Sequence, residues 1–525
     1  MTGGQRRAFL TLGLPLAVFA LRVASAGWEQ RDGINPDAVA YLRNALYWTE
    51  GRFTDAIAGY WSPMFSWSAV PGMLLGYDAL HAARFAIALW GLLLVVLAWL
   101  LMRRLLELPV WLETVAMLLV ADATLMWATT AWPDIIQAAA LLGFTALLWT
   151  PSFLDRRGLQ VLAGISGGVA YLAKAYAFPF FLLWCPLSIA WRARDRARTL
   201  RAWAFAMIGF ALVSGPWMAA LSVKYGHLTY GTAGALNRAI VGPSPHAAPS
   251  WWTPVPGRLA RWETPEVIDR GTWSPFDSRA AMRHQIAYSW RIGNEVLASI
   301  ARFDLLGLAL ALTLLAPFAS AALGRQEESR RLGWIAGTLV LYCAPFVLVY
   351  FTYRYTAPLL RPLCVFACFQ AAWTLSRRLP PIPSTMLLAG VIVSFAAHVN
   401  VPYRPHLVEE TGVTPFNDIT ADGAPHRALA AKLHDVGASG PIASNLDWGG
   451  LYVAYFFGAP FVGIPDTPAA QTCEEQLRAH SVRTFLADRS GVCADVLAAS
   501  ASWRRAATVS PASGETIDVY VPVAP

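Results

Sequence analysis

Eleven long apolar segments constrain this chain more than any other feature of its sequence. A helix needs about 20 mostly apolar residues to cross the hydrocarbon core of a bilayer. The sequence therefore predicts a polytopic α-helical membrane protein with about 11 transmembrane helices. The segments cover about residues 8–26, 82–102, 109–129, 132–150, 159–176, 178–191, 201–222, 303–323, 333–351, 356–376 and 384–400.

The composition agrees with this class and excludes others. Apolar residues make up 56% of the 525 residues and charged residues only 14%, whereas soluble domains carry about 25% charged residues. This excludes a disordered chain, a small disulfide scaffold and an ordinary soluble enzyme. The net charge of +8 is divided among short clusters between the apolar segments. A nucleic-acid-binding protein would instead gather such an excess on one basic face.

The fifth and sixth segments form one continuous apolar run. We place the break between Lys174 and Pro179, because the residue before a proline disfavours the helix and proline lacks a backbone N–H.

The basic clusters set the orientation. With eleven spans and an N-terminus inside the cell, every cluster falls on the cytoplasmic side, as the positive-inside rule requires. One alternative is that the first segment is a secretory signal cleaved after Ala24-Ser25-Ala26. The chain after residue 27 emerges outside in both cases. The clusters are Arg6 and Arg7, Arg103 and Arg104, Arg156 and Arg157, and residues 191–201, 324–331 and 376–378.

Three regions then lie on the external face: residues 27–81, 223–302 and 401–525. We expect a transmembrane domain over 1–400 and a small extracytoplasmic α/β domain over 401–525. The tail pattern predicts a helix at 426–438 and strands at 441–445 and 481–490. Cys473 and Cys493 both lie in this tail, on the oxidising side, and the sequence leaves open whether they form a disulfide. The cysteines at 185, 343, 364 and 368 lie in apolar segments and are expected to be small buried residues.

Two aspartates are the main acidic candidates. Asp37 and Asp134 each follow a proline, as NPDAVAYLRNAL and WPDIIQAAALL, near the start of a predicted helix on the external side. Each carboxylate either complements a helix dipole or takes part in general-base and substrate-positioning work. Asp32, Asp55 and Asp122 are weaker candidates.

Two cations lie at the same level of the membrane. Lys174 interrupts an apolar run, and Arg354 lies in YRYTAPLLRP between the ninth and tenth segments. The structural interpretation of Lys174 is a lysine at the end of a span whose charged group reaches the membrane surface. That of Arg354 is an arginine in the aromatic belt of the membrane interface. The functional interpretation is that they bind a phosphate, which a guanidinium matches well.

The large external loop is rich in tryptophan, including Trp251, Trp252, Trp262 and Trp273. Tryptophan is typical of headgroup depth, so we expect this loop to lie on the membrane. Aromatic platforms also stack on sugars, which makes Trp251 and Trp252 candidate substrate-loop residues. The histidines at 227, 246 and 284 lack metal-ligand spacing, and no ligand cluster decides whether a divalent cation is required. No P-loop, nucleotide fingerprint or nucleophile elbow appears.

In their order along the chain, four stretches resemble the GT-C superfamily of membrane glycosyltransferases, near glycosyltransferase family 39. That family includes protein mannosyltransferases and lipid A aminoarabinose transferases. Two departures leave the donor sugar and the acceptor open: Ala38 follows Asp37 where the family often has Asp-Glu, and Ser62-Pro63 replaces paired prolines. The stretches are NPDAVAYLRNAL with GYWSPMFSWSAVPGMLLG after it, WPDIIQAAALLGFTALLW, GISGGVAYLAKAYAFP and YRYTAPLLRP.

The resemblance implies an inverting transfer of a sugar from a polyprenyl-phosphate donor to an envelope glycan, lipid or protein acceptor. It implies a multi-pass protein of the inner membrane with its active site facing the periplasm and no nucleic-acid partner. Asp37 would be the base, Asp134 would position the acceptor or be a second acid, and Arg354 and Lys174 would be the phosphate-binding cations. The other function classes are a glycolipid flippase or secondary transporter, which favours charges near the bilayer midplane, and a non-catalytic glycan-assembly factor.

Overall fold

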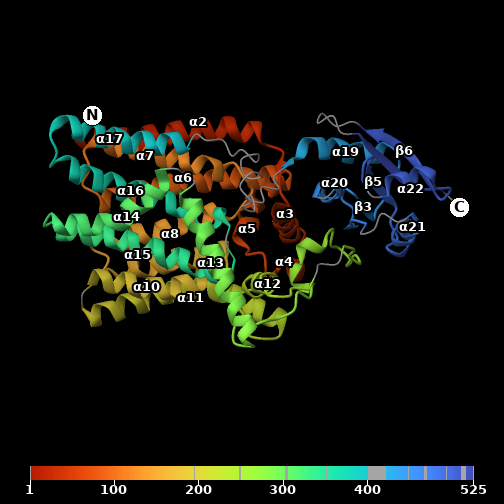
Figure 1. Ribbon diagram of the computed structural model, residues 1–525, viewed down its shortest axis with the longest axis horizontal. Coiled ribbons are helices and arrows are strands. Elements are labelled where there is room, and N and C mark those ends of the chain that lie inside the picture. The colour runs from red at the N-terminus through yellow and green to blue at the C-terminus, as the bar shows by residue number, and fades with distance from the viewer. Residues whose placement is uncertain are drawn as a thin grey trace.

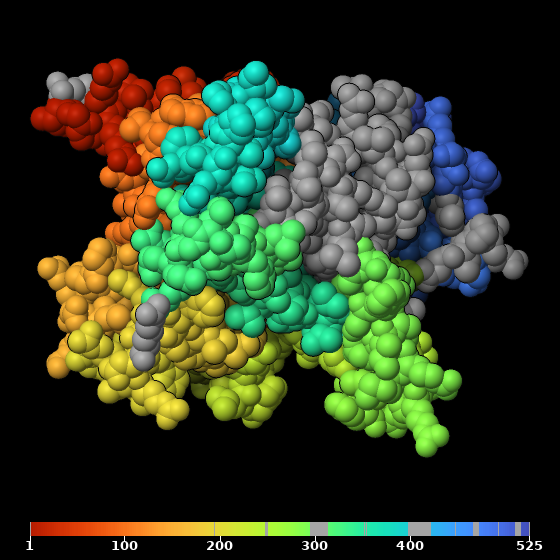
Figure 2. Space-filling model, turned by 60° about the vertical axis from the view of Figure 1, so that its left-hand side comes forward, coloured from red at the N-terminus to blue at the C-terminus, as the bar shows by residue number. Residues whose placement is uncertain are grey.

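Helices run side by side through the first part of the chain, and a mixed sheet lies beyond one end of them (Figure 1). The N-terminal residues, in red, and the C-terminal residues, in blue, are far apart in this view and also in Figure 2. The computed structural model describes residues 2–193, 195–246, 250–301, 305–350, 352–399, 421–446, 448–465, 470–491, 493–509 and 516–523.

Each predicted apolar segment lies largely in a helix where the structure describes it. Within the described residues, six helices are long and apolar enough to cross a membrane. They are Gly3–Glu29, which joins α1 (Gly3–Ala8), the π-turn η1 (Phe9–Gly13) and α2 (Leu14–Glu29), and then α6, α7, α11, α15 and α16. The chain is thus a multi-pass membrane protein. The bounds are α6 (Ala79–Leu105), α7 (Val110–Ala128), α8 (Asp134–Leu148), α9 (Arg157–Ala173), α10 (Ala177–Ala193), α11 (Arg196–Tyr225), α14 (Leu305–Ala322), α15 (Gln326–Leu348), α16 (Ala357–Ser376) and α17 (Pro381–Val399).

The continuous run of the fifth and sixth segments is broken where the sequence predicts. Helix α9 ends at Ala173, Lys174 is extended with φ −150° and ψ 127°, and α10 begins at Ala177. Pro179 lies inside the first turn of α10, where a missing N–H removes no intrahelical hydrogen bond. The break therefore falls a few residues before the proline and leaves Lys174 outside both helices.

The basic clusters gather at the end of the bundle that is remote from the sheet. Arg7 on α1 pairs with Glu113 on α7 at 2.6 Å, and Arg331 on α15 pairs with Glu107 at 3.1 Å. Arg330 donates to the carbonyl of Arg192 at 2.9 Å. The contact of Arg330 with Arg192 joins two basic clusters, 324–331 and 191–201, that are far apart in sequence. The orientation itself stays a prediction.

Glycines bring two of these helices into backbone contact. A Cβ added to Gly164 on α9 would lie 1.7 Å from the carbonyl oxygen of Ala206 on α11, and one added to Gly209 would lie 2.0 Å from that of Val161. Small residues at such positions are the usual means of close helix packing in membranes. This contact fixes α9, and with it the position of Lys174 just beyond its end.

The C-terminal part forms a five-stranded sheet in the order β4-β3-β5-β7-β6. Strand β3 is parallel to β4 and β5, whereas β7 is antiparallel to β5 and β6. The predicted helix and both predicted strands agree with α19, β3 and β5, and the predicted boundary at residue 400 lies outside the described residues. The elements are α19 (Gly423–Asp435), β3 (Ile442–Ser444), α20 (Trp448–Phe457), β4 (Phe461–Gly463), α21 (Ala470–Ala479), β5 (Thr484–Asp488), α22 (Ala494–Ala499), β6 (Trp503–Val509) and β7 (Ile517–Pro522).

The external segments connect the helices to this sheet. Strand β1 (Gly33–Ile34) pairs with β2 (Ala421–Asp422). The loop before α13 reaches strand β4, where the Trp252 N–H donates to the Val462 carbonyl at 2.7 Å. The remaining external elements are α3 (Pro36–Thr49), α4 (Phe53–Ala56), α5 (Met64–Leu74), α12 (Ala233–Ile240), η2 (Arg261–Glu263), η3 (Pro265–Val267), α13 (Arg279–Ala301) and η4 (Tyr353–Tyr355).

Candidate functional site

Asp37 lies in the first turn of α3 and pairs with an arginine far away in sequence. The Asn35 side chain caps the helix by accepting from the Ala38 N–H at 2.8 Å, and Pro36 is the first helical residue. Capping is therefore done by Asn35. The Asp37 carboxylate instead accepts a hydrogen bond from the guanidinium of Arg354.

Asp134 and Lys174 form a second acid–cation pair. Asp134 is the first residue of α8 and is only 3% exposed. One carboxylate oxygen, Oδ1, accepts from Lys174 Nζ at 2.5 Å. The other, Oδ2, has no hydrogen-bond partner within the described part of the chain. The break between α9 and α10 is what allows Lys174 to reach the start of α8.

The two pairs line one cavity of about 260 Å³. Its charges balance, with two carboxylates and two cations. Aromatic and small residues make up much of the wall, including Tyr41, Tyr60, Trp61, Tyr176, Gly231 and Gly234. The four residues that the sequence singled out are thus brought together, although they come from four different parts of the chain.

Aromatic rings hold the two cations in place. Lys174 Nζ lies 3.5 Å from the ring centroid of Tyr355. The Arg354 guanidinium lies 4.9 Å from the ring of Trp132 and 5.4 Å from that of Tyr355. Such contacts are favourable by about 0.5–2 kcal/mol each, depending on desolvation. Tyr355 therefore lies between both cations and couples their positions.

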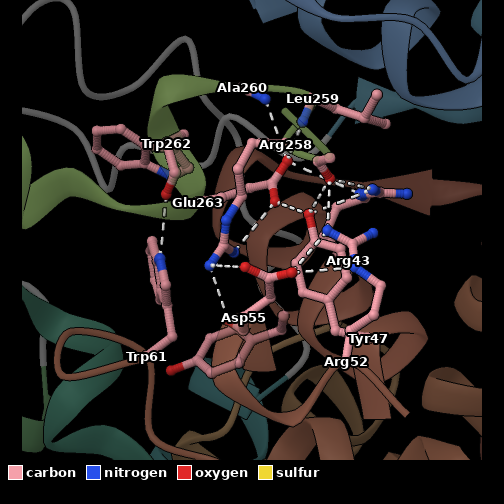
Figure 3. Close-up of polar contacts among 12 residues, drawn as sticks. Arg43, Tyr47, Arg52, Asp55, Trp61, Arg258, Leu259, Ala260, Trp262 and Glu263 are labelled. Carbon is pink, nitrogen blue, oxygen red and sulfur yellow. Dashed lines mark hydrogen bonds and ion pairs between the residues drawn. The ribbon is translucent and has the colours of Figure 1, made fainter. Parts of the chain in front are cut away.

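A buried network in the external loops supports the wall of this cavity (Figure 3). The Trp61 indole N–H donates to the carbonyl of Trp262 at 3.0 Å. Next to Trp262, Glu263 is completely buried and accepts from the N–H groups of Leu259 and Ala260 at 2.7 and 3.1 Å. The large loop is thereby held against the first loop at Trp61, which lines the cavity.

Arginines and a tyrosine complete this network. Tyr47 on α3 donates to Glu263, and the guanidinium groups of Arg43, Arg52 and Arg258 all lie within 5 Å of the Tyr47 ring, at 4.9, 4.3 and 4.8 Å. Burial, followed by the negative charge of Glu263, raises the pKa of Tyr47 well above its ordinary value. The phenol is thus kept as a donor to Glu263.

Trp251 and Trp252 do not line the cavity. Trp251 stacks on His480 with a centroid distance of 4.7 Å, and Trp252 is buried against strand β4. Trp262 packs against Trp61 and Trp448. Trp251 and Trp252 thus contact the C-terminal part of the chain, whereas Trp273 contacts Arg238 and His284. The placement of this loop on the membrane stays a prediction.

The weaker acidic candidates have ion partners outside the cavity. Asp122 pairs with Arg22 on α2. Asp55 pairs with Arg52 at 2.8 Å and with Arg258 at 3.6 Å, and Asp32 lies 3.5 Å from Arg427. No group of three or more His, Cys, Asp or Glu side chains suited to a metal ion occurs among the described residues.

The two cysteines of the tail, Cys473 and Cys493, form a disulfide that ties the loop before α22 to α21. Cys185, Cys364 and Cys368 are buried and Cys343 is partly buried, and all four lie outside the disulfide.

Sequence reasoning missed several residues of the cavity. Gln137 follows Asp134 by three positions and therefore shares its face of α8, which is a signal the sequence did contain. Tyr355 is next to Arg354 in the quoted motif. Asn237 and Gly234 come from α12 in the large loop, and nothing in their local sequence marks them.

Comparisons with known proteins bear on the fold. No protein-family model and no curated protein matches the sequence. Among solved structures, the chain is similar to ArnT from Cupriavidus metallidurans in the apo state, with a TM-score of 0.55 and 14% identity over 96% of this chain and 97% of that one. It is also similar to ArnT from the same organism bound to undecaprenyl phosphate, with a TM-score of 0.56 and 14% identity over 99% and 98% of the two chains. The chain therefore has a GT-C-like fold over nearly its whole length.

Proposed function

We propose that this protein is a glycosyltransferase that moves a sugar from a polyprenyl-phosphate donor to an envelope glycan, lipid or protein acceptor, with inversion. The observation that carries the proposal is the cavity in which Asp37–Arg354 and Asp134–Lys174 lie together. The likeness to ArnT, one structure of which is bound to undecaprenyl phosphate, supports a lipid-linked donor.

The cations are suited to the phosphate of the donor. A guanidinium and an ammonium in a largely enclosed cavity stabilise negative charge more strongly than they would in water. Arg354 is bound to Asp37 in the structure. The phosphate of the donor competes for Arg354, because its two unesterified oxygens share one negative charge and fit the planar guanidinium in a bidentate manner. Its arrival frees the Asp37 carboxylate.

The freed carboxylate then acts as the general base. Asp37 takes the proton from the acceptor hydroxyl, whose oxygen attacks the anomeric carbon from the face opposite the phosphate. The bond between the anomeric carbon and the phosphate oxygen breaks, the configuration inverts, and polyprenyl phosphate leaves with its charge stabilised by Lys174 and Arg354. Asp134 holds Lys174 in position and is the second acid at the substrate.

The proposal includes the topology. Eleven helices cross the inner membrane, from an N-terminus inside the cell to a tail outside it, and the cavity faces the periplasm. Residues 1–400 form the transmembrane domain and 401–525 the external domain. The gathering of the basic clusters at the end remote from the sheet supports this orientation.

An assay with purified protein and undecaprenyl-phosphate sugars tests the reaction. A transferase releases undecaprenyl phosphate when an acceptor extract from the cell envelope is present. A flippase or a non-catalytic assembly factor releases none, and that result would refute the proposal. Mass spectrometry of envelope glycans after deletion of the gene identifies the sugar and the acceptor.

The orientation has its own test. A cysteine placed at Thr54 in the first loop, in a chain whose free cysteines are replaced, is expected to react with a membrane-impermeant maleimide in intact spheroplasts. A cysteine placed at Arg378 is the matched control and is expected to react only after permeabilisation. Reversed labelling contradicts a cavity that opens to the periplasm.

A further inference from the structure

Arg84 on α6 is a buried arginine that binds two other segments of the chain. Its side chain belongs to a residue that is only 9% exposed. One guanidinium nitrogen, Nη1, donates to the carbonyl oxygen of Gly33 at 2.9 Å, and the other, Nη2, donates to that of Thr129 at 2.7 Å. Hydrogen bonds from a charged donor are roughly twice as strong as neutral ones. Arg84 is not among the described residues that line the cavity, so it acts on the site only through these two partners.

The first carbonyl lies four residues before the proposed base. Gly33 belongs to strand β1, which pairs with β2, and Asn35 caps α3 two residues before Asp37. The chain between Gly33 and Asp37 is therefore held along its length by backbone pairing and by the cap. A hydrogen bond to the Gly33 carbonyl fixes where α3 begins, and with it where the Asp37 side chain lies.

The second carbonyl lies five residues before the other acid. Thr129 follows the last residue of α7, where a cation is favoured by the helix dipole. In the connection to α8, the Trp132 N–H donates to the Thr130 carbonyl at 3.0 Å, and α8 begins at Asp134. The Trp132 ring lies 4.9 Å from the guanidinium of Arg354. The connection that Arg84 holds thus carries one acid of the site and a ring that contacts the cation of the other pair.

We propose that Arg84 is a positioning residue that holds Asp37 and Asp134 in register across the cavity. This inference rests on the proposed glycosyl transfer. A guanidinium is planar and presents its nitrogens in a fixed geometry, so the two carbonyls that it binds are held at a fixed separation. Each carbonyl is joined to its acid by a short, structured stretch of chain. Arg84 thereby links the two acids, although it touches neither of them.

The test compares Arg84→Gln with the wild type in the release of undecaprenyl phosphate, with monodisperse protein assayed below its melting temperature. The shorter glutamine amide does not bridge both carbonyls. A misplacement of about 1 Å at a reacting group costs about 100-fold in rate, so kcat is expected to fall about 10- to 100-fold. KM is expected to stay nearly unchanged, because Arg84 does not contact the substrate.

A second measurement separates positioning from a loss of fold. In a chain that already carries Asp37→Asn, Arg84→Gln is expected to lower kcat much less than it does in the wild type, because the base that it positions is gone. A purely structural loss lowers kcat by the same factor in both backgrounds.

Arg104→Gln is the matched control. Arg104 lies on the same helix and also donates to a backbone carbonyl, that of Ala146. Ala146 is near the end of α8 opposite to Asp134, so this variant is expected to keep the wild-type kcat. If Arg84→Gln is poorly folded, Arg84→Lys replaces it. A lysine keeps the charge but has one nitrogen in place of the fork, and a fall in kcat is again expected.

Hydrogen–deuterium exchange gives a readout that does not depend on activity. Arg84→Gln, or Arg84→Lys in its place, is expected to exchange faster than the wild type in both residues 30–41 and residues 127–137, and Arg104→Gln in neither. Faster exchange in only one of the two stretches would refute the bridge.

Two further results would overturn the inference, and they are distinguishable. If the Arg84 variant keeps the wild-type kcat, or loses it equally in both backgrounds, Arg84 has only a structural role while the transferase proposal stands. If the wild type releases no undecaprenyl phosphate from any sugar donor, the proposed function fails and this inference fails with it.

Discussion

Tyr355 lies against Lys174, with its ring centroid 3.5 Å from Nζ, and its neighbour Arg354 bonds Asp37. One short segment between α15 and α16 therefore contacts both acid–cation pairs of the cavity. Arg354 belongs to this segment, whereas Lys174 comes from the break between α9 and α10 and reaches it through the Tyr355 ring.

Replacement of the proposed base, Asp37, is expected to stop the reaction without changing the fold. Asp37→Asn removes the proton acceptor but keeps an oxygen for Arg354, so transfer is expected to fall about 100- to 10,000-fold with expression unchanged. Initial rates of undecaprenyl phosphate release measure this. Asp269→Asn, an exposed acid of the large loop, is the control. An Asp37→Asn protein with most of its activity would contradict the assignment.

Substitutions at Asp134 and Lys174, a buried ion pair, are expected to have non-additive effects on the free energy of unfolding. Asp134→Asn alone leaves the ammonium without its counter-ion, which lowers the free energy of unfolding by about 3–5 kcal/mol. Asp134→Asn with Lys174→Met is expected to lose less than the sum of the two single changes. Thermal unfolding in detergent measures this.

The control for that cycle is an exposed pair. Arg331 and Glu107 lie 3.1 Å apart, with Glu107 68% exposed, and Glu107→Gln is expected to change stability by less than about 1 kcal/mol. Strictly additive effects at Asp134 and Lys174 would show that the two do not form a coupled pair.

The network around Glu263 is expected to control the large loop. Glu263→Gln removes a buried charge that accepts from Tyr47 and from two N–H groups, at a loss of about 1–3 kcal/mol in stability. Trypsin is expected to cut faster after Arg258 and Arg261. Glu50→Gln, at a partly exposed site, is the control, and equal cleavage in both variants would refute this role.

Acid is expected to weaken the C-terminal sheet through Asp518. Burial opposes its ionisation, but hydrogen bonds from Arg489 and Thr508, with the charges of Arg489 and Arg505, outweigh burial and lower its pKa. Since the folded pKa lies below the unfolded one, this stabilisation is present above about pH 4 and is lost as the pH falls through the folded pKa.

Asp518→Asn tests this pH dependence. The variant is expected to be less stable at neutral pH and to lose less stability than the wild type between pH 5 and pH 3, where near-ultraviolet circular dichroism follows the sheet. Parallel curves for the two proteins would exclude Asp518 as a source of the acid sensitivity.

The elements that depend on local pattern could be predicted from the sequence. Apolar length located the helices of the bundle, and the Pro-Asp openings located Asp37 and Asp134 at helix starts. The ion pairs could not be derived from it, because Asp37 and Arg354 are 317 residues apart and meet only through packing. The contact of Trp251 with His480 could not be predicted either, because a tryptophan-rich sequence is typical of both a lipid-facing and a protein-facing surface.

Strands β1 and β2 join residue 33 to residue 422. Their pairing must wait until the ribosome has made most of the chain. Until then, the segment that carries Asp37 lacks its β-partner, although the chain contains Arg354, the ion partner of Asp37, before it contains β2. The first external segment thus has both of its partners, β2 and Arg354, only when synthesis is well advanced into the tail.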